Sequence, residues 1–441
     1  MTEGASSDRR RRVVILLENL PVQRDRRVWR QARALVEAGM AVTVICPADE
    51  PSGRRRFGLH RPLVVDDVEI RAFNPARERQ GPLGFVWEYA LAWLQMTRAL
   101  AACRRCHRVD GIQACNPPDI FFPHAWWARW NGVPFVFDQH DLTPELFETR
   151  FGPLRAGWSR LLHRVLIWCE RATYRGAARV IATNQSYRWE AVDRGRVPPD
   201  DVVVVRNGPD PTVMRPRPVT TVRRPAQRHL VVWMGNMGPQ DGVDDAVRSV
   251  AHLVHAMGRR DVHVVFIGHG EVLEQVRDLA RALRVGDQVT FTGWIPDDEA
   301  FQWLSAASIG LSADPPGPLN DKSTMNKTLE YMSFGLPVVA HDLHETRVSA
   351  GPAAVYAETG DPAGLARCVD RLLRDPELMA TMGRIGRQRI EDHLSWPHQT
   401  GIYVELWASL LGLGPSARPE AEAEDDSTSD DHPTDHSLAT P

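Results

Sequence analysis

The chain has 441 residues, of which 43% are hydrophobic and 25% are charged, a balance typical of globular proteins and not of disordered chains. This length is too great for one ordinary core, so we expect two domains of roughly 200 residues each. The net charge of −3 hides an acidic segment, residues 414–441, and the rest of the chain is mildly basic. A mildly basic body suits anionic ligands such as nucleotide diphosphates, or an anionic lipid surface, and argues against a nucleic-acid binder.

The chain shows no sign of export or of insertion into a membrane. Its first apolar stretch, VVILL, stops at Glu18 and Asn19 and is too short for a secretory signal. We find no run of about 18 uncharged apolar residues, the length that a membrane-spanning helix needs. We therefore expect a cytoplasmic protein whose six cysteines stay reduced. The haem-attachment spacing of Cys103, Cys106 and His107 belongs to exported proteins, so we interpret it as a chance match.

The first part of the chain alternates strands and helices. A basic segment, residues 1–12, is expected to be disordered, and an N-terminal domain is expected over residues 13–208. Short apolar runs predict its strands: RRVVILLENL, MAVTVICP, GIQACNP, PFVFDQHD and ARVIATN. Helical stretches lie between them, in DRRVWRQARALVEAG and at about 84–106 and 154–176. This alternation predicts a parallel sheet that helices cover on both faces.

The pattern repeats after a Pro- and Arg-rich segment, residues 209–228, which we interpret as an interdomain linker. A second domain is expected over residues 229–395, with strands in HLVVWMGN, DVHVVFIGHG, QVTFTGWI, SIGLSAD and LPVVAHD. A last helix, residues 396–413, is expected to return towards the N-terminal domain, and the acidic tail over 414–441 to be disordered. Two such series predict two doubly wound domains, which bind ligands beyond the carboxyl ends of their strands.

The loops at those strand ends, taken in order, resemble glycosyltransferase family 4, retaining enzymes of the GT-B architecture. Four segments carry the resemblance: ILLENLPVQRDRRVWRQARAL, FDQHDLTPELFETRF, VIATNQSY with VVVVRNGPD, and the stretch from VVWMGNMGPQDGVDDAV through GHGE and FTGWIPDDE to NKTLEYMSFGLPVVA. The resemblance implies an α/β fold with two Rossmann-like, parallel-sheet domains facing a cleft. It also implies a nucleotide diphosphate sugar as co-substrate, with no other cofactor and no bound metal.

The resemblance places the sugar donor in the C-terminal domain. The loop with Gly235, Asn236 and Gly238 connects a strand to a helix, so its backbone amides and the helix dipole would contact a phosphate. A plain strand-to-helix turn is the alternative interpretation. The predicted donor side is completed by Gly268, by Asn326, and by Gly293, Trp294 and Ile295, whose backbone would contact the base.

The stretch NKTLEY holds the sharpest predicted site. By resemblance, Glu330 accepts hydrogen bonds from the ribose hydroxyls, and Lys327, on the same helix face, neutralises the β-phosphate. A solvated Lys–Glu pair is the alternative. The chain departs from the family twice, because Lys322 stands where a second glutamate is usual and Asp241 where the glycine loop usually has a lysine. We therefore predict that Lys322, Lys327 and Arg206 meet the phosphate charge.

The acceptor is expected on the N-terminal side of the cleft. His140 matches the family's histidine beside the transferred sugar, where it would hydrogen-bond a sugar hydroxyl, and Asp141 would orient it or cap the next helix. Arg26 and Arg27 could hold an anionic acceptor such as a lipid diphosphate; solvated arginines on a capped helix are the alternative. Glu145 is a further acceptor-side candidate. The predicted catalytic residues are His140, Lys327 and Glu330.

These features predict a retaining glycosyltransferase that moves a sugar from a nucleotide diphosphate sugar to a glycan, glycolipid or lipid-linked acceptor, in surface or exopolysaccharide synthesis. By resemblance, the leaving phosphate itself takes the acceptor proton, so the pair of carboxylates that a glycosidase needs is not required. Two alternatives stay open. One is a non-hydrolysing nucleotide-sugar epimerase, and the other is a catalytically inactive, glycosyltransferase-like protein that binds nucleotide or serves as a scaffold.

Two helical stretches combine aromatic and basic residues. Trp87 and Trp93 lie near Arg98 in the first, and Trp158 and Trp168 lie among arginines in the second. Basic amphipathic helices with tryptophan can lie on a membrane surface, whereas the same residues often pack in a domain core. The expected partners are a nucleotide sugar and a glycan or lipid-linked acceptor, with peripheral association at the inner face of the membrane as an open alternative; no nucleic acid is expected.

Overall fold

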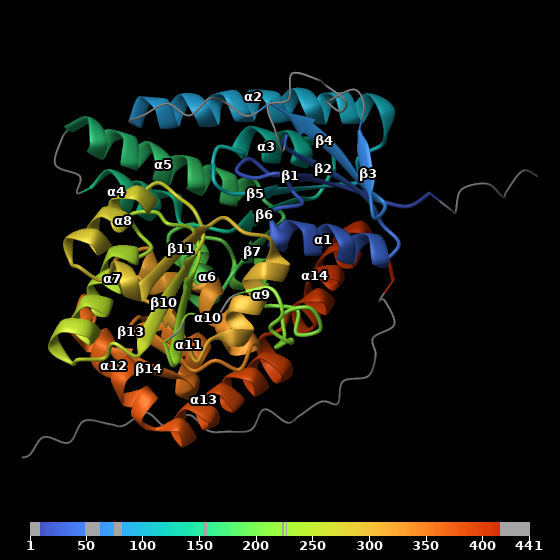
Figure 1. Cartoon of the computed structure of the whole chain (residues 1–441). Helices are drawn as coiled ribbons and strands as arrows, with labels where there is room; N and C mark the ends of the chain where they lie inside the picture. The colour runs from blue at the N-terminus through green and yellow to red at the C-terminus, as the bar shows by residue number, and fades with distance from the viewer. Residues whose placement is uncertain are drawn as a thin grey trace, which may run out of the picture.

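The computed structural model describes residues 9–48, 62–74, 82–152, 157–222, 225 and 227–414. These residues form two α/β domains, with the blue and cyan N-terminal elements at the top of Figure 1 and the yellow and orange C-terminal elements below them. The predicted basic N-terminal segment and acidic tail lie outside the described residues, apart from 9–12 and 414.

The N-terminal domain is built on an eight-stranded sheet of order β3-β4-β2-β1-β5-β6-β7-β8. All neighbouring strands are parallel except the edge pair of β3 and β4, which is antiparallel. The strands are β1 (Arg12–Leu16), β2 (Ala41–Pro47), β3 (Leu63–Val65), β4 (Val68–Phe73), β5 (Gly111–Cys115), β6 (Phe135–Gln139), β7 (Arg179–Ala182) and β8 (Val202–Val204).

Helices connect these strands and cover both faces of the sheet, so its central strand is completely buried from Val13 to Leu16. Such a continuous apolar run is what a parallel strand between two helix layers requires. The helices of this domain are α1 (Arg26–Glu37), α2 (Pro82–Cys106), α3 (Phe122–Trp130), α4 (Thr143–Phe151), α5 (Gly157–Gly176) and α6 (Gln185–Asp193).

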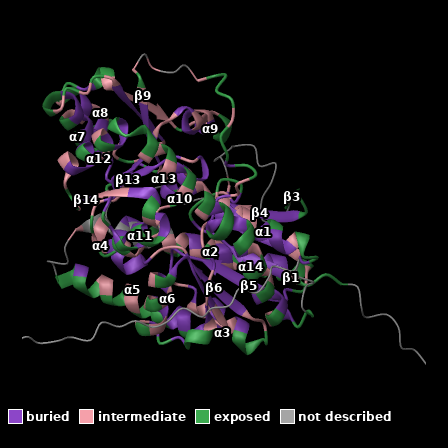
Figure 2. Cartoon of the chain, turned by 90° about the horizontal axis from the view of Figure 1, so that it is seen from below, coloured by how far each residue is buried: buried purple, intermediate pink, exposed green. Residues whose placement is uncertain are grey.

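The C-terminal domain has a six-stranded, fully parallel sheet of order β11-β10-β9-β12-β13-β14. Its strands are β9 (His229–Met234), β10 (Val262–Ile267), β11 (Val289–Gly293), β12 (Ile309–Ser312), β13 (Val338–His341) and β14 (Ala354–Ala357). Its helices are α7 (Val243–Ala251), α8 (Leu273–Ala282), α9 (Asp297–Ala306), α10 (Asn326–Ser333), α11 (His344–Ala350), α12 (Pro362–Arg374) and α13 (Pro376–Arg389). Figure 2 shows buried residues concentrated in the strands of both sheets and exposed residues on the outer helix faces.

The last helix, α14 (Trp396–Leu411), belongs to the core of the N-terminal domain and lies beside α1 in Figure 1. Trp407 is completely buried there. A Cβ added to Gly111 at the start of β5 would lie 2.3 Å from the Trp407 ring, so only glycine fits under this ring. The C-terminal end of the chain therefore completes the core of the first domain.

Two doubly wound α/β domains are present, and this prediction is confirmed. The sequence analysis missed four strands: β3, β4 and the short strands β8 and β14. In β4 two buried charged residues, Glu69 and Arg71, interrupt the apolar pattern. Glu69 pairs with Arg71 at 2.6 Å and with Arg12 on β1 at 3.0 Å. These charges are neutralised by each other and by Arg12, and a pattern of single residues does not reveal such pairs.

Candidate active site

A cavity of about 680 Å³ lies between the two domains, where loops follow β1, β6 and β8 of one sheet and β11 of the other. This position, beyond the carboxyl ends of parallel strands, is where doubly wound domains bind ligands. The N-terminal domain and its last helix contribute Asn19, Leu20, Gln23, Arg24, Asp25, Arg26, Arg27, Arg30, His140, Asp141, Asn207, Gly208, Pro209 and Trp396. The C-terminal domain contributes Trp294, Pro296, Asp297, Asn326 and Glu330.

The N-terminus of α1 brings several arginines to the cavity. Asp25 caps this helix, since its carboxylate accepts a 2.9 Å hydrogen bond from the Val28 amide. The guanidinium of Arg24 lies over the Trp294 ring of the other domain, 5.8 Å from its centroid. Arg30 donates to the Gly208 carbonyl at 2.5 Å, and burial together with the nearby Arg26 charge lowers the pKa of Arg30.

Arg26 spans the cavity between the domains. One of its guanidinium nitrogens lies 2.7 Å from an oxygen of Glu330 on α10, and the other lies 2.5 Å from Asp297 at the start of α9. Burial raises the pKa of Glu330 above its usual value, although the charges of Arg26 and Arg30 act against this. The predicted donor carboxylate and a predicted acceptor arginine are thus direct partners.

Lys327, one turn before Glu330 on α10, lies beside the glycine loop. It is buried, and its ammonium group lies 2.6 Å from the Asp314 carboxylate and 4.8 Å from the centroid of the Trp233 ring. A Cβ placed on Gly235 would come 3.4 Å from the Lys327 side chain. The alternative of a solvated Lys–Glu pair is therefore wrong, because Lys327 has an internal partner and Glu330 is held by Arg26.

The glycine loop after β9 packs tightly against the turn that follows β10. A Cβ on Gly268 would lie 1.9 Å from the Gly235 carbonyl oxygen, so the turns after β9 and β10 touch through their backbones. Inside the loop, the Gly238 amide donates a 2.9 Å hydrogen bond to the Asp241 carboxylate. Burial raises the pKa of Asp241 to about 6. Asp241 thus occupies an amide of the loop that was predicted to contact a phosphate.

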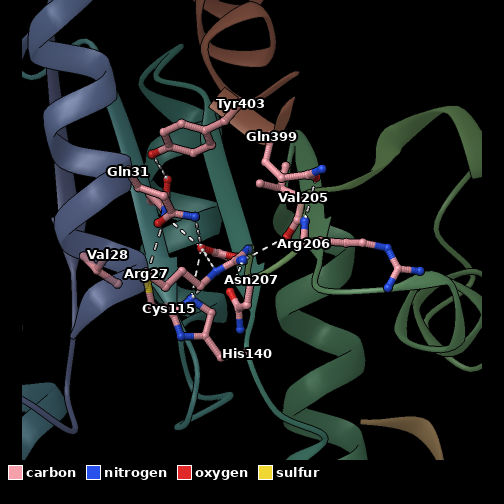
Figure 3. A network of polar contacts seen from close by, with 12 residues as sticks. Arg27, Val28, Gln31, Cys115, His140, Val205, Arg206, Asn207, Gln399 and Tyr403 are labelled. Atoms are coloured by element: carbon pink, nitrogen blue, oxygen red, sulfur yellow. Dashed lines mark hydrogen bonds and ion pairs between the residues drawn. The ribbon is translucent and has the colours of Figure 1, made fainter. Parts of the chain in front are cut away.

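His140 belongs to a buried charge network at the end of β6, shown in Figure 3. Its Nε2 lies 3.0 Å from the Asp138 carboxylate, and the Arg27 guanidinium contacts that carboxylate at 2.7 Å from the other side. Burial opposes a charge on His140, but Asp138 and Cys115 raise its pKa well above the usual value. The pKa of Asp138, by contrast, is well below its usual range, because the charges of Arg27 and His140 outweigh the cost of burial.

Further amides complete this network. Asp138 accepts hydrogen bonds from Gln31 at 2.7 Å and from Gln113 at 3.0 Å, and Gln113 in turn accepts one from Tyr403 of α14 at 2.7 Å. Donor atoms of Cys115, Asp138 and His140 lie within 4.8 Å of one another, the spacing of a metal site. Since cationic and amide groups already surround Asp138, we assign this cluster to charge balance and not to a metal.

The predicted acceptor-side residues take different positions. Arg26 and Asp141 line the cavity. Arg27 also lines the cavity, but its guanidinium binds Asp138, the Val205 carbonyl and the Asn207 side chain. It therefore stabilises the His140 network and does not bind an acceptor. The predicted cap by Asp141 is wrong, because α4 begins after Leu142 with no side-chain cap.

Lys327 and three other predicted residues do not line the cavity. Lys322 lies 2.5 Å from Glu190 of α6 and 4.0 Å from Glu145, so it joins the two domains on another side. Glu145 itself pairs with Arg194 at 2.6 Å. The Arg206 side chain points away from the His140 network in Figure 3, and one of its buried nitrogens has no partner among the described residues.

The remaining predicted donor residues divide in the same way. Trp294 and Asn326 line the cavity, and Trp294 is largely exposed. The cavity lining does not include Gly235, Asn236, Gly238, Gly268, Gly293 or Ile295. The first four belong to the loops after β9 and β10, and Gly293 and Ile295 are the neighbours of Trp294 in the chain. No finding tests which of these residues touch a donor, so their roles stay predictions.

Some residues of the site were missed by the sequence analysis. Asn116 after β5 accepts hydrogen bonds from the backbone amides of His140 and Asp141, and donates to the Asp141 carbonyl, so it fixes this loop. Asp297 and Arg30 were missed as well. A signal existed for Arg30, because it lies four residues after Arg26 and therefore on the same helix face.

Two family models match the chain. A glycosyl transferase 4-like domain matches residues 25–208, and the model of glycosyl transferases group 1 matches residues 228–375. These two matches correspond to the two domains on either side of the cavity, and together they cover most of the chain.

Known proteins agree with these matches. D-inositol 3-phosphate glycosyltransferase of Acidothermus cellulolyticus is 28% identical over 299 residues, which are 63% of this chain and 64% of that protein, just under two thirds of its length. Sucrose-phosphate synthase of Thermosynechococcus elongatus shares the fold with a TM-score of 0.71 at 15% identity, over 91% of this chain and 100% of that one. Anabaena HepE in complex with UDP-glucose superposes with a TM-score of 0.65 at 17% identity, over 90% of this chain and 99% of that one. The family indicated by the sequence is thus confirmed, and the chain belongs to the glycosyltransferases of the GT-B fold, with a 4-like N-terminal domain and a group 1 C-terminal domain.

Proposed function

We propose that this chain is a retaining glycosyltransferase that moves a sugar from a nucleotide diphosphate sugar to a glycan, glycolipid or lipid-linked acceptor in surface or exopolysaccharide synthesis. The observation that carries the proposal is the two-sided lining of the cavity. Asn326 and Glu330 of α10 face it from one domain, and Arg26, Arg30 and His140 face it from the other. A transferase needs such a site, in which two substrates meet away from bulk water.

The donor lies on the C-terminal side in this proposal. Glu330 accepts the ribose hydroxyls, and Trp294 closes the cavity next to the base. Lys327 and the amides of the glycine loop stabilise the charge that develops on the leaving diphosphate. Support comes from the position of Lys327, which is held against Gly235 by its 2.6 Å contact with Asp314. The structure of Anabaena HepE was solved in complex with UDP-glucose, so UDP-glucose is the first donor to test.

The acceptor lies against α1. Arg24, Arg26 and Arg30 supply positive charge there, so an acceptor with a phosphate or other anionic group fits best. The name of the Acidothermus relative, D-inositol 3-phosphate glycosyltransferase, also specifies a phosphate on its acceptor. A lipid-linked acceptor carries such groups at the inner face of the membrane, where we propose that the protein acts.

The transfer itself needs little from the protein in the way of proton chemistry. The bond between the sugar C1 and the phosphate oxygen breaks, the acceptor oxygen bonds to C1 on the same face, and its proton passes to the leaving phosphate. Asp138 raises the pKa of His140, which favours the protonated ring. His140 therefore donates a hydrogen bond to a sugar hydroxyl and does not act as a base.

One observation favours the second candidate, a glycosyltransferase-like protein that binds a nucleotide without turnover. The Asp241 carboxylate accepts a hydrogen bond from the Gly238 amide inside the glycine loop. A carboxylate there repels a diphosphate unless it is protonated, and its pKa of about 6 leaves it mostly charged at neutral pH. No comparable feature favours an epimerase.

A panel of nucleotide diphosphate sugars, beginning with UDP-glucose, tests these proposals by thermal shift and by release of nucleotide diphosphate. We expect one donor to stabilise the protein and to be hydrolysed slowly, and Glu330→Gln to remove both effects. Glu358→Gln, at an exposed position of the same domain, is the matched control. Stabilisation without any release of nucleotide, with or without acceptors, would favour the inactive binder. No stabilisation by any donor would contradict the donor site.

A further inference from the structure

The N-terminal domain exposes large apolar side chains on two neighbouring helices. Trp130 at the end of α3 is 93% exposed, and Leu161 of α5 is 64% exposed. About half of each side chain is also exposed at four other positions: Trp126, Trp158, Val165 and Trp168. We call these six residues the α3–α5 surface. An exposed group of this size, with four tryptophans, marks an interaction site and not ordinary surface variation.

The six residues form one continuous surface. On α5 they recur at intervals of three or four residues, so they share one face of the helix. Phe122 of α3 joins the two helices, since its ring centroid lies 5.1 Å from that of Trp168 and 5.1 Å from that of Trp126. Trp130 is one turn beyond Trp126. In Figure 2 the two helices lie along the same edge of the molecule, with exposed residues facing outward.

The charges around this surface have one sign. Arg129 of α3 is exposed, and so are the arginines of α5, which are Arg160, Arg164, Arg171 and Arg175. Within the described part of these two helices the only acid is Glu170, which is completely buried against Arg194. The α3–α5 surface is therefore apolar, aromatic and basic, with no exposed acid on its own helices.

We propose that the α3–α5 surface docks the protein on an anionic lipid bilayer, with the tryptophans at the headgroup level and the arginines against lipid phosphates. None of the described helices is long and apolar enough to cross a membrane, so this contact is peripheral. The inference deepens the proposed function and rests on it in one respect, because a lipid-linked acceptor requires such a surface. A second copy of the chain is a poorer occupant, since a two-fold contact would bring the arginines of both copies together.

The docked surface is also connected to the acceptor side of the cavity. Helix α4 begins three residues after His140 and packs on α5. Helix α4 therefore connects the loop that holds His140 to the helix that carries most of the α3–α5 surface.

Flotation of the purified protein with lipid vesicles tests the proposal. One vesicle contains phosphatidylcholine alone, and the other contains equal parts of phosphatidylcholine and phosphatidylglycerol. We expect binding to the anionic vesicle, with a blue shift of tryptophan fluorescence, and weaker binding as salt screens the arginines. Trp130→Ala with Trp158→Ala, two exposed positions away from the Phe122 contacts, should reduce binding roughly tenfold, because apolar area inserted in the interface sets the affinity.

Charge variants provide the matched control. Arg160→Glu with Arg164→Glu on α5 should abolish binding to the anionic vesicle, whereas Arg277→Glu with Arg281→Glu on α8 of the other domain should leave it unchanged. Donor hydrolysis in the absence of lipid should be the same in all these variants. Equal binding by the α5 and α8 variants, no binding by the wild type, or a dimer in sedimentation that the tryptophan variants disrupt would overturn the lipid assignment. Vesicle binding without any donor binding would instead contradict the proposed function alone.

Discussion

The guanidinium of Arg26 contacts two carboxylates of the opposite domain, Glu330 at 2.7 Å and Asp297 at 2.5 Å. The proposed function gives Glu330 to the ribose of the donor, so a donor must displace Arg26 from it. The released guanidinium is then available to an anionic acceptor in the same cavity. Acceptor binding would then follow donor binding, because the guanidinium of Arg26 can bind an acceptor only after the donor has displaced it from Glu330.

Arg26→Ala tests this exchange. We expect donor affinity to be unchanged or to rise a few fold, because the donor no longer competes with a guanidinium for Glu330. We expect kcat/KM for an anionic acceptor to fall by roughly 10- to 100-fold, the usual effect of losing a hydrogen bond between charged groups. Calorimetry and initial rates measure the two effects. Arg33→Ala, on the exposed side of the same helix, should change neither. A donor affinity lowered tenfold would show that Arg26 binds the donor instead.

His140 should stay protonated through neutral pH. Burial alone would lower its pKa, but the Asp138 carboxylate at 3.0 Å raises it well above the usual value. An NMR titration of the ring should therefore show no loss of the proton between about pH 6 and 8, the range in which an unperturbed histidine titrates. His140→Gln identifies the signal. We expect kcat to fall roughly 100-fold in this variant, with no new step in the pH profile. A midpoint near pH 6.5 would contradict the charged network.

At the scale of single elements, α14 links the end of the chain to the His140 network. Its Trp407 fills the space under Gly111, and its Tyr403 donates to Gln113, which binds Asp138. Trp407→Ala should cost about 3–5 kcal/mol, the usual penalty for removing a buried tryptophan, and should lower activity as well. Thermal unfolding and kcat measure the two effects. Ile402→Ala, at a half-exposed position of α14, should leave both nearly unchanged. A large loss in that control would mean that α14 is sensitive along its whole length.

Helix α5 holds a buried carboxylate, Glu170, whose pKa burial raises to about 8 even though Arg194 lies 2.8 Å away. Arg194 is shared with Glu145 and Glu190, so it does not offset the burial of a third carboxylate. The folded protein therefore binds one more proton than the unfolded chain between about pH 4.5 and 8. Since the folded state holds the extra proton at this position, the contribution of Glu170 to the free energy of unfolding falls as pH rises through this range.

Glu170→Gln removes this term, so its melting temperature should change less than that of the wild type between about pH 5 and 8. Above about pH 8 the variant should be the more stable protein by a few degrees, because it buries no charge at this position. Differential scanning fluorimetry over this range measures the difference. Glu377→Gln, an exposed carboxylate on α13, should follow the wild-type curve. A variant that is less stable than the wild type at neutral and high pH would show that Glu170 is already ionised at neutral pH and that its pair with Arg194 stabilises the fold.

Most elements could be predicted from the sequence, because parallel strands buried on both faces appear as apolar runs between amphipathic helices. The exceptions have physical reasons. β4 hides its strand pattern behind the buried Glu69 and Arg71, and β14 is short. At the site, the loops at strand ends were predictable as a set, but the partners of Arg27, Lys322 and Glu145 were not. Each of these partners comes from a distant part of the chain, which local spacing does not encode.

At the scale of the whole molecule, charged pairs hold the domains together on two sides of their interface. Arg26 with Glu330 lies in the cavity, and Lys322 with Glu190 of α6 lies outside its lining. Near Lys322, Asn184 donates to its backbone carbonyl at 2.8 Å, and Ser186 donates to Glu345 at 2.5 Å. The contact between the two domains therefore depends in part on Lys322, which was predicted to bind the donor phosphate.

Lys322→Ala and Glu190→Gln decide between these two roles for Lys322. If Lys322 acts by joining the domains, both substitutions weaken donor binding by the same few fold, the double variant adds nothing further, and small-angle scattering shows a larger radius of gyration in all three. If Lys322 contacts the donor phosphate, Lys322→Ala lowers donor affinity by roughly 100-fold, as expected for a charge-assisted bond to phosphate. Glu190→Gln then leaves affinity unchanged or improves it, because it releases the ammonium group. We expect the first result, because Lys322 lies 2.5 Å from Glu190 and is not among the residues that line the cavity.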